Sequence, residues 1–283
     1  MPKKKVITCI VTIAASCVLV LGACSSEDST SKTKDTKTTQ TTTKKTTEKT
    51  TLDWSYQGDT DPSHWGSIKK EYKISDTGKK QSPINIDTKK VKEDKTKATI
   101  EYKYQPTMFK VTRKDQTIQA IAQSAKGRQD SKVKVAGKEY VLKEINIHTP
   151  SEHQLDGKDF VAELQLKHVS SDNKTLIISV FVNQGEENQA IADIPSIVAK
   201  SKNGETTAMK QAVSTLGIIP SDDNKVFAYE GSFTTPATNE GVTWMVYETP
   251  ITMSKQQLQD LKTKLNDNNR PVQALNNRQV MSN

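Results

Sequence analysis

The sequence predicts a mainly β domain built on one large, mostly antiparallel, twisted sheet with a few short peripheral helices. Six segments alternate or run in β-branched and apolar residues, and Gly, Asp or Asn bound them. Only two stretches have a helical pattern. The length of residues 53–283 is also within the range of a single all-β domain.

The predicted strands follow one another with turn residues between them. They lie within residues 97–104, 108–123, 131–148, 159–170, 175–185 and 242–253. The segments "RKDQT" (113–117) and "VAGKEY" (135–140) have the composition of hairpin tips. Strands that outnumber helices in this way favour one antiparallel sheet over a layered α/β fold.

The two predicted helices span residues 188–200 and 254–266. Pro195 should break the first, because proline removes a backbone donor inside a helix. The second begins after Ser254, a candidate N-cap, and leucines recur at positions 258, 261 and 265.

Residues 1–23 are typical of an exported signal peptide. Three lysines at positions 3–5 precede an apolar run that is short for a membrane-spanning helix. The run ends in Leu21-Gly22-Ala23-Cys24, which resembles the bacterial lipobox. We therefore expect cleavage before Cys24 and acylation of its thiol, which would anchor the chain to the extracellular face of the bacterial cell membrane. The alternative is an uncleaved helical anchor.

Residues 24–52 are predicted to be a disordered, lipid-anchored tether. Positions 25–52 hold 12 Thr and 4 Ser, and their only apolar residue is Leu52. Such a segment cannot bury enough surface to offset the entropy lost on ordering. A wall-binding or glycosylated stalk is the alternative, and composition does not separate the two.

Charge and cysteine content exclude several function classes. The formal charge of +8 falls to +3 for residues 53–283, and no arginine-rich aromatic cluster suggests a nucleic-acid partner. All three cysteines lie in the first 24 residues. The domain therefore has no thiol for a disulfide, a metal or nucleophilic catalysis. Nor does any serine pair with a plausible free histidine, so we set a hydrolase aside.

The stretch "EINIHTPSEHQLDGKDFVAELQLKH" (144–168) has the spacing of a metal site built on two strands. Residues two apart on a strand share a face, so Glu144, Asn146 and His148 should point together. Glu163, Gln165 and Lys167 should do the same on the second strand. Two ligands from one strand and one from its neighbour would leave a fourth zinc position open for water. The geometry suits zinc, but two of the residue types do not.

Eight segments in order resemble blocks of the α-class carbonic anhydrase family. They are "HWG" (64–66), "QSPINI" (81–86), "TIQ" (117–119), "HTPSEH" (148–153), "AELQLKH" (162–168), "YEGSFTTP" (229–236), "EGVTW" (240–244) and "NNRPVQALNNR" (268–278). The resemblance covers nearly all of residues 54–280. It implies the single-domain fold of that family and zinc-dependent hydration of carbon dioxide.

Carried over position by position, the three zinc histidines fall at Asn146, His148 and Gln165, so only His148 is retained. The proton-shuttle histidine would fall at Gln116, whose amide does not titrate near neutral pH. Amide oxygens are weaker zinc ligands than imidazole. We therefore expect no zinc, or weakly bound zinc, at a degenerate site. His153 and His168 match positions that are structural in the family.

Other parts of the family's pocket are retained. The resemblance makes Thr234 and Glu152 the pair that orients a zinc-bound hydroxide, with Thr235 beside them. The apolar pocket wall falls at Ile177, Phe233, Val242 and Trp244. Lys167 replaces an apolar wall residue, and Glu144 stands where an amide is usual.

Two functions remain open. The chain is predicted to be a surface binding module with lost or strongly weakened hydration activity, whose partner is an acidic glycan, a cell-wall polymer or a small anion attracted by lysines such as Lys167. The alternative is an active extracellular carbonic anhydrase with an altered metal site.

Overall fold

The computed structural model describes residues 51–94, 100–124, 126–127, 129–220 and 225–283. The predicted signal peptide, Cys24 and residues 24–50 of the predicted tether lie outside them. Leu52 lies inside: its backbone N–H donates to a carboxylate oxygen of Asp115 at 2.5 Å. Its side chain packs against the aromatic cluster of Trp54, Tyr56 and Trp65. None of the helices among the described residues is long and apolar enough to cross a membrane.

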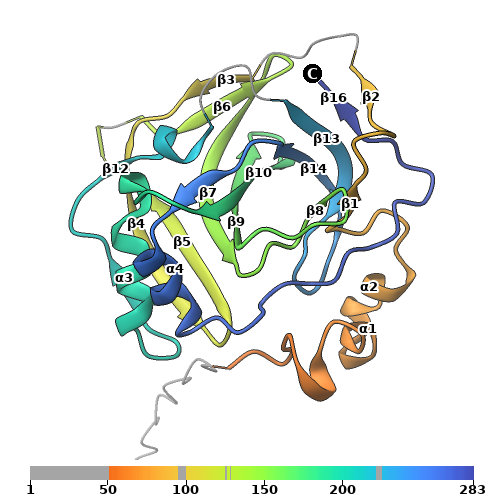
Figure 1. The fold of residues 1–283 in the computed structure, drawn as a ribbon, viewed down its shortest axis with the longest axis horizontal. Helices are drawn as coiled ribbons and strands as arrows, with labels where there is room; N and C mark the ends of the chain where they lie inside the picture. The colour runs from red at the N-terminus through yellow and green to blue at the C-terminus, as the bar shows by residue number, and fades with distance from the viewer. Residues whose placement is uncertain (1–50, 95–99, 125, 128, 221–224) are drawn as a thin grey trace, which may run out of the picture. The chain divides into compact units, whose positions relative to one another are not determined.

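Strands dominate the described part of the chain (Figure 1). They are β1 (Asn85–Ile86), β2 (Lys92–Glu93), β3 (Ile100–Lys103), β4 (Pro106–Lys114), β5 (Thr117–Gln123), β6 (Lys132–Val135), β7 (Lys138–His148), β8 (Gln154–Leu155), β9 (Ala162–Ser170), β10 (Thr175–Gln184), β11 (Thr206–Ala208), β12 (Val213–Ser214), β13 (Val226–Ser232), β14 (Glu240–Tyr247), β15 (Ile251–Met253) and β16 (Met281–Ser282).

One large twisted sheet contains all of these strands except β1 and β8, which pair with each other. Its main path runs β11-β4-β5-β7-β9-β10-β14-β13-β16-β2. Most neighbours are antiparallel, whereas β10 runs parallel to β14 and β15, and β16 parallel to β2. The mainly β, mostly antiparallel prediction is confirmed. The sheet is mixed because β14 and β15 lie parallel to β10, which they follow only after the intervening residues 185–239.

The sheet has an apolar cluster on each face, as the strand period of two requires. On β10, Leu176, Ile178 and Val180 join one cluster, whereas Ile177 and Phe181 join the other. Burial on both faces explains why "TLIISVF" is a continuous apolar run rather than an alternating one. Strand β10 is therefore packed on both faces, whereas the apolar side chains of β7 and β9 join the first cluster only.

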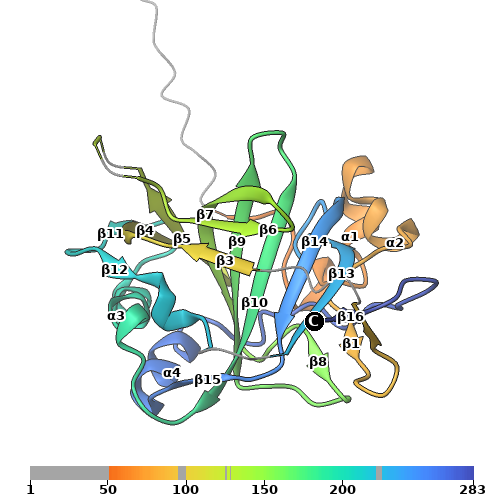
Figure 2. The same cartoon turned by 90° about the horizontal axis from the view of Figure 1, so that it is seen from above.

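The helices are short and lie outside the sheet (Figures 1 and 2). α3 and α4 pack together beside β4, and α1 and α2 lie on the other side. The α-helices are α1 (Trp65–Ile68), α2 (Ile74–Thr77), α3 (Asp193–Lys200) and α4 (Lys255–Lys262), and the 3₁₀ turns are η1 (Gly58–Thr60), η2 (Lys70–Tyr72), η3 (Gln189–Ile191) and η4 (Thr215–Ile218).

The local predictions for turns and caps can be compared directly with the structure. Both hairpin tips are confirmed, with Asp115 and Ala136 in the left-handed region. Ser254 caps α4 through a capping box with Gln257, as expected. The prediction for Pro195 is wrong: the break between η3 and α3 falls at Ala192, and Pro195 sits in the first turn of α3. Its missing N–H costs nothing there, because first-turn donors have no partner within the helix.

Candidate functional site

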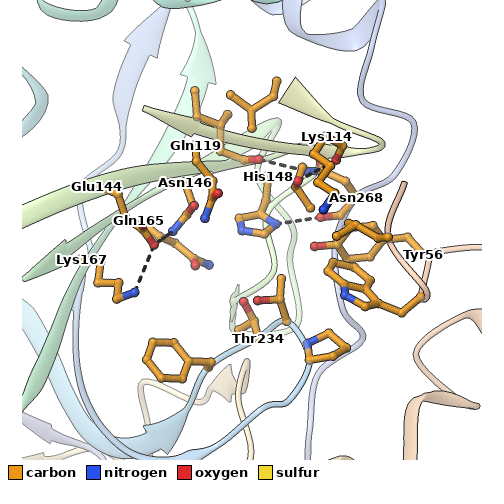
Figure 3. Close-up of a pocket in the computed structure, with 18 of the residues that line it drawn as sticks. Tyr56, Lys114, Gln119, Glu144, Asn146, His148, Gln165, Lys167, Thr234 and Asn268 are labelled. Atoms are coloured by element: carbon orange, nitrogen blue, oxygen red, sulfur yellow. Dashed lines mark hydrogen bonds and ion pairs between the residues drawn. The ribbon is translucent and has the colours of Figure 1, made fainter. Parts of the chain in front are cut away.

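A cavity of about 510 Å³ opens on one face of the central strands (Figure 3). Side chains from β5, β7, β9 and β10 line it, together with the segment that follows β13. Trp54 and Tyr56 of the aromatic cluster contribute to another wall. The cavity brings together nine of the predicted site residues: Glu144, Asn146, His148, Gln165, Lys167, Ile177, Phe233, Thr234 and Thr235.

Asn146 and Gln165 face each other across the antiparallel pair β7 and β9. On the other side of β7, Gln119 of β5 lies opposite Asn146. Three carboxamide side chains therefore stand in one row across three neighbouring strands. Hydrogen-bonded central strands of the sheet place them, so their positions do not depend on a loop.

His148 is almost fully buried and held in one orientation. Its Nδ1 lies 2.7 Å from the backbone carbonyl of Asn268 and 3.5 Å from Oε1 of Glu152. Both of these groups accept hydrogen bonds, so Nδ1 carries the proton. When Nδ1 alone carries a proton, Nε2 is an acceptor available to the cavity.

The amide nitrogen of Gln165 points away from the cavity. Nε2 donates to Oε2 of Glu152 at 2.7 Å and to Oε1 of Glu163 at 3.1 Å. A carboxylate only accepts, which assigns the nitrogen to that side of the amide. Oε1 of Gln165 is therefore the polar atom left for the cavity.

Glu163 is the centre of a buried network beneath the cavity. It accepts from Nδ1 of His153 at 2.8 Å, from the hydroxyl of Ser179 at 2.7 Å and from two backbone N–H groups. Burial alone would raise its pKa, but the His153 ring and these donors hold the pKa at about 2. Nε2 of His153 lies 2.7 Å from the hydroxyl of Tyr229. The interpretation of His153 as a hydrogen-bonded structural residue agrees with this network.

The pair predicted to orient a hydroxide is arranged differently from what the resemblance implies. Glu152 accepts from Gln165 and, through Oε1, from the backbone N–H of Arg270 at 2.9 Å. Within the described ranges, no hydrogen bond joins the Thr234 hydroxyl to Glu152. Thr234 faces the cavity, whereas Glu152 lies behind its wall.

Lys167 and Glu144 form an ion pair at one side of the cavity (Figure 3). Nζ lies 3.3 Å from Oε1 of Glu144 and 5.1 Å from the centre of the Phe233 ring. The same carboxylate oxygen accepts from Nδ2 of Asn146 at 3.3 Å. The side chains are 26% and 17% exposed, so water and ligands can reach this charged pair.

The remaining predicted wall residues lie at different depths. Ile177 reaches the cavity from β10. Val242 and Trp244 are buried in the apolar cluster behind it. Gln116, at the shuttle position, lies in the β4–β5 hairpin and donates to the Asn266 carbonyl at 3.1 Å.

Sequence reasoning missed several residues that shape the cavity. Trp54 and Tyr56 form part of its wall, and Asn268 positions His148 from 120 residues away. Gln119 was inside a family-like block but was given no role. Its place on a predicted strand before the "INIH" strand was the signal that could have found it.

The donor set does not fit a catalytic zinc ion. It consists of one imidazole nitrogen and two neutral amide oxygens, whereas zinc sites use Cys, His and carboxylate ligands. Among the described residues, no cluster of three or more His, Cys, Asp or Glu side chains is arranged to hold a metal. The amide nitrogens of both amides are also engaged with carboxylates.

Comparison with known proteins places this arrangement in context. The model of the eukaryotic-type carbonic anhydrase family matches residues 60–283. A carbonic anhydrase of Klebsiella pneumoniae is 32% identical over 230 residues, which cover 81% of this chain and 90% of that protein. The α-carbonic anhydrase of Thermovibrio ammonificans, solved with the inhibitor sulfanilamide, superposes with a TM-score of 0.73 at 32% identity over 81% of this chain and 98% of that one. Dioscorin, solved in complex with ascorbate, superposes with a TM-score of 0.74 at 27% identity over 82% of this chain and 98% of that one.

Proposed function

The chain belongs to the eukaryotic-type carbonic anhydrase family, and we propose that it is a binding member with lost or strongly weakened zinc-dependent hydration of carbon dioxide. One observation carries the proposal. The Gln165 amide nitrogen bonds to both Glu152 and Glu163, so the carboxylates behind the cavity are satisfied without a cation.

The energetics of the site support this proposal. In a zinc site, hydrogen-bond partners behind each ligand residue hold its coordinating atom toward the ion. Here the amide at position 165 has its strongest donor group turned to the carboxylates, and its oxygen is a neutral, weak zinc ligand. Loss of one residue that hydrogen-bonds to a zinc ligand typically lowers zinc affinity about 10–100-fold. Replacing two of the ligands themselves should therefore lower the affinity further.

The geometry of Glu152 also supports weakened catalysis. The family resemblance implies that Thr234 and Glu152 form a hydrogen-bonded pair that orients a hydroxide. Here Gln165 and the Arg270 backbone N–H donate to the two carboxylate oxygens, and no hydrogen bond joins Glu152 to the Thr234 hydroxyl among the described residues. The Thr234 hydroxyl is therefore available to bind a ligand in the cavity rather than to orient a nucleophile.

We further propose that lipidation at Cys24 displays this domain outside a bacterial cell membrane. The support is the sequence pattern of residues 1–24 followed by the Thr-rich segment. In this setting the cavity would take a small anion, and surface lysines would meet an acidic glycan or cell-wall polymer. Dioscorin, a family member solved with ascorbate, supports the idea that this fold can act as a small-molecule binder.

The decisive experiment measures the zinc content of the purified chain before and after equilibration with zinc, together with its carbon dioxide hydration rate by stopped flow. We expect substoichiometric zinc and no sulfonamide-sensitive rate. Near-stoichiometric zinc with turnover would overturn the proposal. It would establish the alternative, an active carbonic anhydrase with an altered metal site, which the relatives that bear that name favour.

A further inference from the structure

Three acceptor atoms converge on the part of the cavity between β7 and β9. Nε2 of His148 is an acceptor because Nδ1 donates to Asn268. Oε1 of Gln165 is an acceptor because the nitrogen is bonded to Glu152 and Glu163. Oδ1 of Asn146 is left because Nδ2 donates to Glu144. Protein acceptors orient each of these side chains, so this acceptor triad (Asn146, His148 and Gln165) favours a ligand that supplies hydrogen-bond donors.

The adjoining part of the cavity carries positive charge. Lys167 has three N–H donors, and its contacts are a long ion pair to Glu144 and the Phe233 ring. Lys114 lines the cavity as well, and no ion pair to it occurs among the residues that the structure describes. Two ammonium groups against one cavity-lining carboxylate leave an excess positive charge, which favours an anionic group on the ligand.

The spacing of Gln165 and Lys167 lets one small ligand reach both side chains. Gln165 and Lys167 share a face of β9, and at about 3.3 Å per residue their Cα atoms lie roughly 6.6 Å apart. Long side chains that rise from positions this close can both reach one small molecule that carries a hydroxyl and a carboxylate on adjacent carbons. The cavity volume of about 510 Å³ admits such a molecule and a larger one that carries more hydroxyls.

We infer that the cavity binds a small hydroxycarboxylate, with its hydroxyl groups on the acceptor triad and its carboxylate on Lys167. This inference rests on the proposed function, because a zinc ion would claim the same acceptors. It names the ligand class of the binding member: a hydroxy acid or sugar acid rather than a simple carboxylate or a neutral polyol.

Three matched probes test the inference by isothermal titration calorimetry on the purified chain. Glycerate carries both groups, propionate has the carboxylate without hydroxyls, and glycerol has the hydroxyls without the carboxylate. We expect glycerate to bind about 10-fold or more tightly than either partial probe, since a charge-assisted hydrogen bond contributes more than a neutral one. Equal binding of the three probes, or no binding of glycerate, would overturn the inference.

Two variants separate the contributions of the two subsites. Lys167→Met keeps the stem but removes the charge, and it should abolish the preference of glycerate over glycerol. Asn146→Ala removes one acceptor and should reduce the preference of glycerate over propionate by about 2–10-fold. Lys110→Met, at an exposed position of β4 outside the cavity lining, is the matched control and should leave all three affinities unchanged. Unchanged preferences in both cavity variants would place the ligand elsewhere.

Failure of the ligand class can be told apart from failure of the proposed function. Each titration is accompanied by the zinc content and hydration rate of the same sample. A zinc-loaded, active sample overturns the proposed function whatever glycerate does. A zinc-poor, inactive sample that does not bind glycerate overturns only the hydroxycarboxylate inference.

Discussion

The two ends of one face of β9 differ in what satisfies the hydrogen bonds of their polar side chains. Glu163, Gln165 and Lys167 follow one another along β9, and they pass from a fully buried network to a solvated cavity. At the buried end, protein donors satisfy the Glu163 carboxylate. At the cavity end, acceptors and an ammonium group face the solvent. Because water can satisfy the cavity end, residues there can change chemistry without unfolding the domain, whereas the buried end cannot.

Restoring the two missing ligands should have the largest effect. The double variant Asn146→His plus Gln165→His would present three imidazoles from rigid strands, and we expect zinc affinity to rise about 10⁴-fold, at roughly 100-fold per position. Chelator competition and metal content measure this change. Adding His148→Ala to the double variant should remove the gain. A double variant that stays metal-free would mean that the cavity frame itself has changed.

Breaking the buried end should cost most in stability. Glu163→Gln leaves the His153 ring and the Ser179 hydroxyl without their carboxylate, so we expect the free energy of unfolding to fall by about 3–5 kcal/mol. Urea denaturation measures it, with Glu186→Gln at an exposed position as the control. A loss below 1 kcal/mol would show that the network is not the stabilising unit described above.

His168, on the opposite face of β9, should make the stability of the domain depend on pH. Burial lowers the pKa of His168 to about 3, below its ordinary value of 6.5. The unfolded chain then binds the proton first, so stability is complete above pH 6.5 and falls as the pH drops toward 3. From pH 6 to 5 the loss should approach about 1.4 kcal/mol for this group. Denaturation at several pH values tests the slope, and His168→Asn should flatten it.

The smallest effect is expected at the cavity wall. Thr234→Val removes a hydroxyl for which the described residues provide no hydrogen bond to Glu152, so the free energy of unfolding should change by no more than about 0.5 kcal/mol. Thermal unfolding checks it. Destabilisation above about 1.5 kcal/mol would indicate that Thr234 does donate to Glu152, as the family resemblance implies.

Much of the fold followed from local patterns in the sequence. The alternation in β4, β5 and β7, the apolar run of β10 and the capping box of α4 each depend on neighbours only a few residues away. The strand β13 was missed because "VFAYEGS" contains glycine, which is disfavoured in strands, and its pairing with β14 decides its structure. Two-residue strands such as β1 and β16 carry no periodic signal at all.

For the site, the sequence by itself determined the residue types: one histidine and two amides at the family's ligand positions, with a lysine beside them. A period of two placed them on common strand faces. Only the tertiary structure decided which end of each amide meets the cavity, because Glu152, Glu163 and Glu144 orient the nitrogens. The Asn268 carbonyl, 120 residues from His148, likewise decides which ring nitrogen is an acceptor. Hydrogen-bond direction depends on partners brought together by folding, and a linear pattern does not contain them.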